Sequence, residues 1–231
     1  MRRLGKALPI AAVVLLLSPI ALGGRDDVVL DLNGLIAARP GQVQLLFENP
    51  YVWVTSVTLK PGESLPMHET GKRIVYPLTY SELLYVPNYE PEQVAENEGA
   101  VHWHPNEAHA LVNRGKTAVR RVAVIRKPYP LPKPGVQVCC EVVEKTPFNA
   151  RIIFENNEAR VIEIRLQRGE SQPVHFASNR VIYSLSSYRL RMGDEVHRYD
   201  PGSVDWSGPS EHSVENVGES EARYIVFELK R

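Results

Sequence analysis

The sequence predicts an all-β protein that contains two similar units in tandem. The chain repeats itself: one block recurs 107 residues later (175 − 68 = 107) and a second block recurs 103 residues later (212 − 109 = 103). A repeat of this length indicates a duplicated structural unit, with a loop of different length between the two blocks. The matched positions include Phe47-Glu48-Asn49 with Phe154-Glu155-Asn156, Gly62-Glu63-Ser64 with Gly169-Glu170-Ser171, His68 with His175, Arg73 with Arg180, Tyr76 with Tyr183, Gly99 with Gly202, His109 with His212 and Asn113 with Asn216.

The segments within each unit have the pattern of short strands. Runs rich in Val, Ile, Tyr and Thr alternate with turn signals such as Pro-Gly and Asp-Pro-Gly. Several short strands in about 100 residues are typical of a sandwich or of a jelly-roll barrel, and the runs alone do not choose between these. Helical patterns are weak, with one short candidate within 29–38. The clearest strands are expected at Val52–Leu59, Arg73–Leu78, Val119–Ile125, Arg160–Leu166, Val181–Leu185 and Arg223–Leu229.

The chain starts with the pattern of a signal peptide. Three basic residues precede an apolar run that ends in small residues at Gly23 and Gly24. We expect cleavage there and a periplasmic or secreted protein. The alternative is a retained membrane anchor, although Pro9 and Pro19 interrupt the run.

A proline-rich segment divides the remainder of the chain. Residues 127–135 contain four prolines, which lack the amide donor that a sheet interior needs. The predicted organisation is therefore a signal peptide at 1–24, a first barrel at 25–127, a linker at 128–135 and a second barrel at 136–231.

Composition narrows the functional classes. The chain has 27 basic and 27 acidic residues, and loss of the three basic residues of the leader leaves a net charge of 24 − 27 = −3. This balance argues against nucleic acid as a partner. Cys139 and Cys140 are adjacent, which is too close for ordinary disulfide geometry, so we expect two packed thiols rather than a strained disulfide.

Each unit carries two glycine- and histidine-containing patterns. The first pattern joins a glycine to a histidine across five residues, and the second ends in a histidine followed by an asparagine four positions later. They read Gly62-x5-His68 with Gly99…His109-x3-Asn113 in the first unit, and Gly169-x5-His175 with Gly202…His212-x3-Asn216 in the second.

These patterns resemble the two motifs of the cupin superfamily, and the match covers nearly the whole chain after the leader. The resemblance implies two tandem cupin-type barrels, that is, double-stranded β-helices or jelly rolls. It also implies that two first-motif histidines, a glutamate and the second-motif histidine would converge on a metal in each barrel. The sequence departs from this set: Thr70 and Ala177 replace the second histidine, and Ile74 or Val75 and Val181 or Ile182 fall at the glutamate.

Two histidines per barrel are few for a metal site. Catalytic sites usually draw three protein ligands, so His68 and His109 would need help from His104 or Glu107 in the first barrel. We therefore consider one divalent transition metal, Fe, Mn, Zn or Ni, in the first barrel, and a weaker site at His175 and His212 in the second. The alternative is that each histidine is half-buried and donates to a backbone carbonyl.

Arg73 and Arg180 are candidate ligand-binding residues. Arg73 begins a strand and lies on the same face as Val75. If this face lines the barrel, a guanidinium stands beside the histidines and the pocket favours an anionic ligand. The alternative is an ion pair at the barrel rim. Tyr76 and Tyr183 are considered with the arginines as ligand-binding residues, and alternatively as core packing.

Two functional hypotheses follow. The first is an exported two-barrel protein that binds a small polar or anionic molecule without robust catalysis. The second is a metal-dependent oxygenase or isomerase that acts through the first barrel. Either way, the expected partner is a small molecule, with no membrane association after leader cleavage, and the chain is a candidate homodimer.

Overall fold

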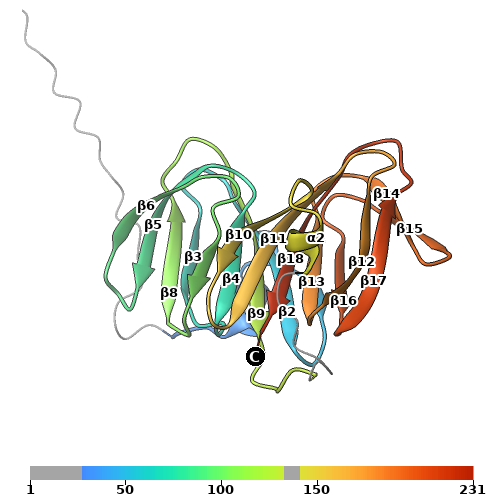
Figure 1. The fold of residues 1–231 in the computed structure, drawn as a ribbon. Coiled ribbons are helices and arrows are strands. Elements are labelled where there is room, and N and C mark those ends of the chain that lie inside the picture. Colours follow the sequence, from blue (N-terminus) through green and yellow to red (C-terminus); the bar gives the residue numbers. More distant parts are fainter. Residues whose placement is uncertain (1–27, 133–140, 231) are drawn as a thin grey trace, which may run out of the picture.

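The computed structural model describes residues 28–132 and 141–230. Within these ranges the chain forms two units side by side, each with one five-stranded and one four-stranded sheet (Figure 1). The prediction of an all-β protein with two tandem barrels is confirmed. The predicted signal peptide, part of the predicted linker, Cys139 and Cys140 lie outside the described residues.

The first unit combines a short helix with two antiparallel sheets. Its five-stranded sheet has the order β1-β2-β9-β4-β7, and its four-stranded sheet has the order β3-β8-β5-β6. The elements are α1 (Leu32–Ala38), β1 (Val43–Glu48), β2 (Val52–Leu59), β3 (Ser64–His68), β4 (Arg73–Pro77), β5 (Ser81–Pro87), β6 (Glu92–Glu96), β7 (His102–His104), β8 (His109–Asn113) and β9 (Val119–Arg126).

The second unit repeats this topology strand for strand. Its sheets have the orders β10-β11-β18-β13-β16 and β12-β17-β14-β15, which are the first-unit orders with each strand number raised by nine. The elements are α2 (Glu141–Lys145), β10 (Ala150–Glu155), β11 (Ala159–Leu166), β12 (Ser171–Ala177), β13 (Arg180–Ser184), β14 (Tyr188–Met192), β15 (Glu195–Tyr199), β16 (Val204–Ser207), β17 (Ser210–Asn216) and β18 (Ala222–Leu229).

The six predicted strands are all present, and their ends differ from the prediction by at most one residue. The predicted helix is α1, which begins after Asp31, whose carboxylate accepts a hydrogen bond from the Gly34 amide at 2.7 Å. Leu32 and Leu35 on its inner face are buried in the first barrel. The five-residue helix α2 was not predicted. Among the described residues, no helix is long and apolar enough to cross a lipid bilayer.

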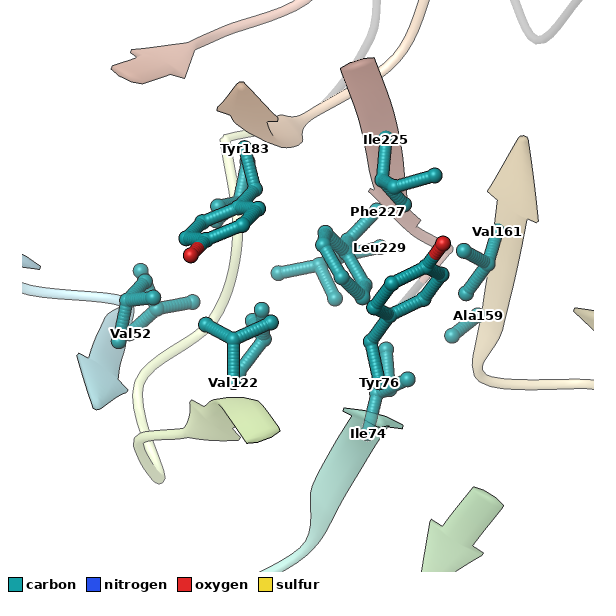
Figure 2. Packing of buried hydrophobic residues seen from close by; sticks show 13 residues of the cluster. Val52, Ile74, Tyr76, Val122, Ala159, Val161, Tyr183, Ile225, Phe227 and Leu229 are labelled. Carbon is teal, nitrogen blue, oxygen red and sulfur yellow. The ribbon is translucent and has the colours of Figure 1, made fainter. Parts of the chain in front are cut away.

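The two five-stranded sheets pack against each other in the middle of the molecule, and the four-stranded sheets lie at its outer ends (Figure 1). Figure 2 shows the apolar core between them. The rings of Tyr76 and Phe227 meet edge to face with centroids 6.4 Å apart, a favourable aromatic arrangement. The cluster contains Val52, Val54, Ile74, Tyr76, Val122, Val124, Ala159, Val161, Val181, Tyr183, Ile225, Phe227 and Leu229.

Alternation along β4 decides which side chains enter the barrel. Ile74 and Tyr76 face the partner unit, so Arg73 and Val75 point into the first barrel. Tyr183 takes the same place as Tyr76 in the second unit. The two tyrosines therefore pack between the barrels, away from both interiors, and the ligand-binding role considered for them does not fit this position.

Candidate functional site

The motif histidines of each barrel meet across neighbouring strands. His68 on β3 is in register with His109 on β8, and their ring centroids are 4.0 Å apart. His175 on β12 is in register with His212 on β17, with centroids 4.3 Å apart. The structure thus brings together the two pairs that the sequence patterns place more than 35 residues apart (109 − 68 = 41; 212 − 175 = 37).

A proline two residues before the first-motif histidine shapes each pair. The strand register shifts between Leu65 and His68, and again between Gln172 and His175, because a proline cannot donate to the ladder and favours a bulge. The proline carbonyl then accepts from the histidine: Nδ1 of His68 lies 2.7 Å from the Pro66 oxygen. Nδ1 of His175 lies 2.9 Å from the corresponding Pro173 oxygen. With Nδ1 as the donor, Nε2 of each ring is left without the proton.

Three of the four motif imidazoles, His68, His109 and His212, are neutral at physiological pH. Burial lowers the pKa of His68 to about 4, and burial together with the neighbouring His68 and Arg73 holds the pKa of His109 well below its usual range. Burial, Arg180 and His175 lower the pKa of His212 to about 3. These three rings therefore add hydrogen-bonding groups rather than charge to the two interiors.

Arg73 stands beside the histidines inside the first barrel. Its Nη2 atom lies 3.1 Å from Nε2 and 3.3 Å from Nδ1 of His109, and 3.3 Å from the Tyr85 hydroxyl. The Tyr85 hydroxyl donates to Oε1 of Glu107 at 2.6 Å. Among the described residues, no carboxylate pairs directly with Arg73. Its side chain therefore lies inside the barrel and does not form the ion pair at the barrel rim that was the alternative.

This arrangement does not fit a metal ion. His104 stands 3.2 Å from the Tyr85 hydroxyl and 3.6 Å from Glu107, so these two candidates do lie near the histidine pair. The guanidinium of Arg73, however, already occupies the space next to the ring nitrogens of His109 as a fixed positive charge. Within the described residues, no group of three or more His, Cys, Asp or Glu side chains is placed to hold a metal. The geometry does not support the divalent transition metal considered for this barrel.

Arg180 occupies the equivalent position in the second barrel. Its Nη1 atom donates to the Ser178 and Gly208 carbonyls, both at 3.1 Å, and Nη2 donates to the Ser210 hydroxyl at 3.3 Å. It is 5% exposed, and burial lowers its pKa, yet a guanidinium stays charged in proteins. Among the described residues, no carboxylate forms an ion pair with it. Glu228, its register partner on β18, lies close enough to raise the pKa of Arg180 but accepts a hydrogen bond from Arg160 at 3.1 Å.

The two barrels differ in the space that they leave. The first has a cavity of about 40 Å³ next to His68 and Arg73, and the second has one of about 270 Å³ lined by His175, Arg180 and His212. Space for a water molecule is about 30 Å³. The first cavity therefore holds a water at most, whereas the second can hold a small organic molecule.

Side chains that differ between the two repeats explain this difference in cavity volume. In the first barrel Ser81 pairs across the ladder with Glu96, and Glu96 forms a buried ion pair with Arg121. Leu32 and Leu35 of α1 also fill this interior. The corresponding positions of the second barrel hold three tyrosines that line the cavity: Tyr188, Tyr199 and Tyr224.

Sequence reasoning missed these tyrosines and Tyr85. The signal was present, since the repeat shifts of 107 and 103 align Ser81 with Tyr188 and Glu96 with Tyr199. A larger, open hollow of about 760 Å³ lies outside the barrels, beside Trp53 and Tyr129. It contains none of the motif histidines, Arg73 or Arg180.

At the level of sequence, no protein-family model and no curated protein matches the chain. Solved structures are similar in fold. AerE from Microcystis aeruginosa has a TM-score of 0.58 at 12% identity, over 81% of this chain and 97% of AerE. Salicylate 1,2-dioxygenase from Pseudoaminobacter salicylatoxidans, in adducts with gentisate, has a TM-score of 0.54 at 14% identity, over 82% of this chain and 74% of the dioxygenase chain.

A cupin 2 conserved barrel domain protein from Leptotrichia buccalis is also similar, with a TM-score of 0.49 at 12% identity, over 81% of this chain and 88% of that protein. At these identities, the likenesses to AerE and to the dioxygenase show the fold alone. They are consistent with the strand topology of the two units.

Proposed function

The chain is a two-domain cupin by fold, and from this premise we propose that it binds a small anionic molecule in the cavity of its second barrel. Binding, rather than turnover, is the proposed role, because among the described residues each barrel offers two imidazoles and a guanidinium instead of a full set of metal ligands.

The observation that supports this proposal is the state of Arg180. A buried cation without a carboxylate partner is costly unless an anion compensates it. Arg180 is 5% exposed, is held by two carbonyls and a hydroxyl, and lines a cavity of about 270 Å³. Glu228 also pairs with Arg160 and compensates Arg180 only in part, so a bound anion would add negative charge through strong charge-assisted hydrogen bonds.

The duplicated arginine gives a matched test. A thermal-shift screen of small carboxylates and phosphates should raise the melting temperature of the wild-type protein. We expect Arg180→Met to abolish this response, while Arg73→Met responds like the wild type relative to its own melting temperature, because its cavity of about 40 Å³ admits no such ligand. Equal shifts for the wild type and Arg180→Met, or loss of the shift with Arg73→Met instead, would contradict the proposal.

The place of action is part of the proposal. We propose that residues 1–24 are removed on export and that the protein works in the periplasm or outside the cell, with the predicted barrels at 25–127 and 136–231 as its two domains. N-terminal sequencing of protein recovered from the native host's exported fraction tests this. A chain that retains Met1 would contradict cleavage.

A further inference from the structure

We infer that the ligand of the second barrel is a small monocarboxylate with an apolar body, rather than a phosphate or a dianion. This inference rests on the proposed function and narrows its ligand class. It is carried by the charges that face the cavity and by the tyrosines that wall it.

The cavity has one cation to offer an anion. Among the described residues that line it, Arg180 is the single arginine or lysine. The lining also contains Asp205 and Glu228, and Glu228 is already engaged by Arg160. Arg180 compensates a ligand with one negative charge. A second negative charge on the ligand would have no further cation to pair with and would be repelled by the carboxylate of Asp205.

His212 adds a polar ring but no charge to the lining. The pKa of His212 is lowered to about 3 by burial and by Arg180, so this ring is neutral. Its Nδ1 atom is buried and has no partner with hydrogen-bond geometry, although the Ser210 backbone lies close enough to oppose part of the pKa lowering. That nitrogen has no surface open to the cavity, so the charge of Arg180 alone carries the choice of an anion.

The remaining walls suit an apolar body. The ring of Tyr188 lies 4.9 Å from that of Tyr199 at 27° and 5.5 Å from that of Tyr224 at 31°. Burial raises the pKa of all three phenols, so they stay neutral. Apolar side chains complete the wall: Val142, Ile162, Ile164, Leu190, Met192 and Val214. A space of about 270 Å³, equal to roughly nine water molecules, accommodates an acid with a single six-membered ring.

Four matched probes test the inference on the wild-type protein by isothermal titration calorimetry. They are cyclohexanecarboxylate, the neutral cyclohexylmethanol, cyclohexane-1,4-dicarboxylate and inorganic phosphate, at one ionic strength. We expect the monocarboxylate to bind at least tenfold more tightly than each of the others, because it alone combines one negative charge for Arg180 with an apolar ring. This comparison needs no variant and is unaffected by folding defects.

Two variants identify the side chains that bind the carboxylate and the apolar body of the ligand, and a third variant is the control. Arg180→Met should make the acid and the alcohol bind equally, and Tyr199→Ser should weaken the acid through its apolar body. Arg191→Met is the charge-matched control, since Arg191 is exposed on β14 and pairs with Glu215 at 2.8 Å, and it should leave the affinity unchanged. Circular dichroism confirms that each variant is folded.

The outcomes separate this inference from the proposed function. Tighter binding of phosphate or of the dicarboxylate, lost in Arg180→Met, would overturn the monocarboxylate class and leave anion binding in the second barrel intact. Equal binding of the acid and the alcohol to the wild type, or no binding of any anion, would overturn both.

Discussion

The Nη2 atom of Arg73 lies 3.1 Å from Nε2 and 3.3 Å from Nδ1 of His109, so one guanidinium nitrogen approaches both nitrogens of the ring. A metal ligand offers its nitrogen lone pair to a cation, and here a fixed cation, the Arg73 guanidinium, already lies against the face of the ring. Arg180 stands at the same strand position in the second barrel and contributes to the low pKa of His212. The duplicated unit has therefore kept one positive charge beside each histidine pair.

This relationship predicts a low metal content. Protein purified without a histidine tag should contain metal well below one ion per chain by plasma mass spectrometry, because a divalent ion would have to share the His109 ring with a guanidinium. The content should not change in a His68→Ala, His109→Ala double variant. Stoichiometric metal in the wild type that disappears in this variant would contradict the prediction.

The positive charge of Arg73 should also lower the pKa of His104. Burial, followed by the charges of Arg73 and Arg121, lowers the pKa of this imidazole to about 3. In Arg73→Met we expect the pKa to rise by on the order of one unit or less, and to stay below 6.5, because burial remains the larger cause. NMR of the assigned His104 ring measures it. A pKa that is the same in both proteins would show that Arg73 does not act on this ring.

Buried histidines predict loss of stability in mild acid. His68, His104 and His212 have pKa values of about 4, 3 and 3 in the folded protein, against about 6.5 in the unfolded chain. Between these values the unfolded chain binds more protons, so the free energy of unfolding falls as the pH falls from 6.5. Each ring contributes up to about 1.4 kcal/mol per pH unit, which gives a decrease on the order of a few kcal/mol by pH 5.

Urea unfolding at pH 7, 6 and 5 measures this decrease. The window lies above the range in which ordinary carboxylates titrate, so the histidines dominate the change. His68→Gln should show a shallower dependence on pH than the wild type. A free energy of unfolding that is constant from pH 7 to pH 5 would contradict the folded-state pKa values.

The sequence was sufficient for the architecture and for the histidine pairs. The repeat shifts and the strand patterns predicted two units, and the motif positions predicted that His68 would meet His109. The repeat is recorded directly in the spacing along the chain, whereas the meeting of the histidines was implied by the resemblance of the motifs to the cupin superfamily.

The side chains that line each barrel could not be predicted from sequence spacing alone. Whether Arg73 or Tyr76 enters the barrel depends on which face of β4 meets the other unit, and alternation alone leaves both choices open. The cavity of the second barrel depends on three side chains from separate strands, Tyr188, Tyr199 and Tyr224. Its volume also depends on how the neighbouring helix packs, and such details come only from the folded structure.

The core between the barrels predicts a sharp contrast between two phenylalanines. Phe227 is fully buried between the five-stranded sheets against Tyr76, whereas Phe148 is 98% exposed. Phe227→Ala should lower the free energy of unfolding by about 3–5 kcal/mol, because it removes a large buried ring and leaves a cavity. Phe148→Ala, the same chemical change at the surface, should alter it by less than about 0.5 kcal/mol. Similar values for the two variants in urea unfolding would contradict the packing between the sheets.

The buried ion pair of the first barrel predicts non-additive mutational effects. Arg121 donates to Glu96, and Ser81 lies 3.4 Å from the same carboxylate oxygen. Glu96→Leu alone leaves a buried guanidinium without its carboxylate, which should cost about 3–5 kcal/mol.

Adding Arg121→Met to Glu96→Leu should recover most of that loss, since an apolar pair of similar volume needs no desolvation of charge. The second barrel already uses uncharged side chains, Tyr199 and Tyr224, at these two positions. A double-mutant cycle from urea unfolding measures the coupling, which should exceed about 2 kcal/mol in magnitude. Additive losses in the double variant would mean that the two side chains stabilise the first barrel independently of each other.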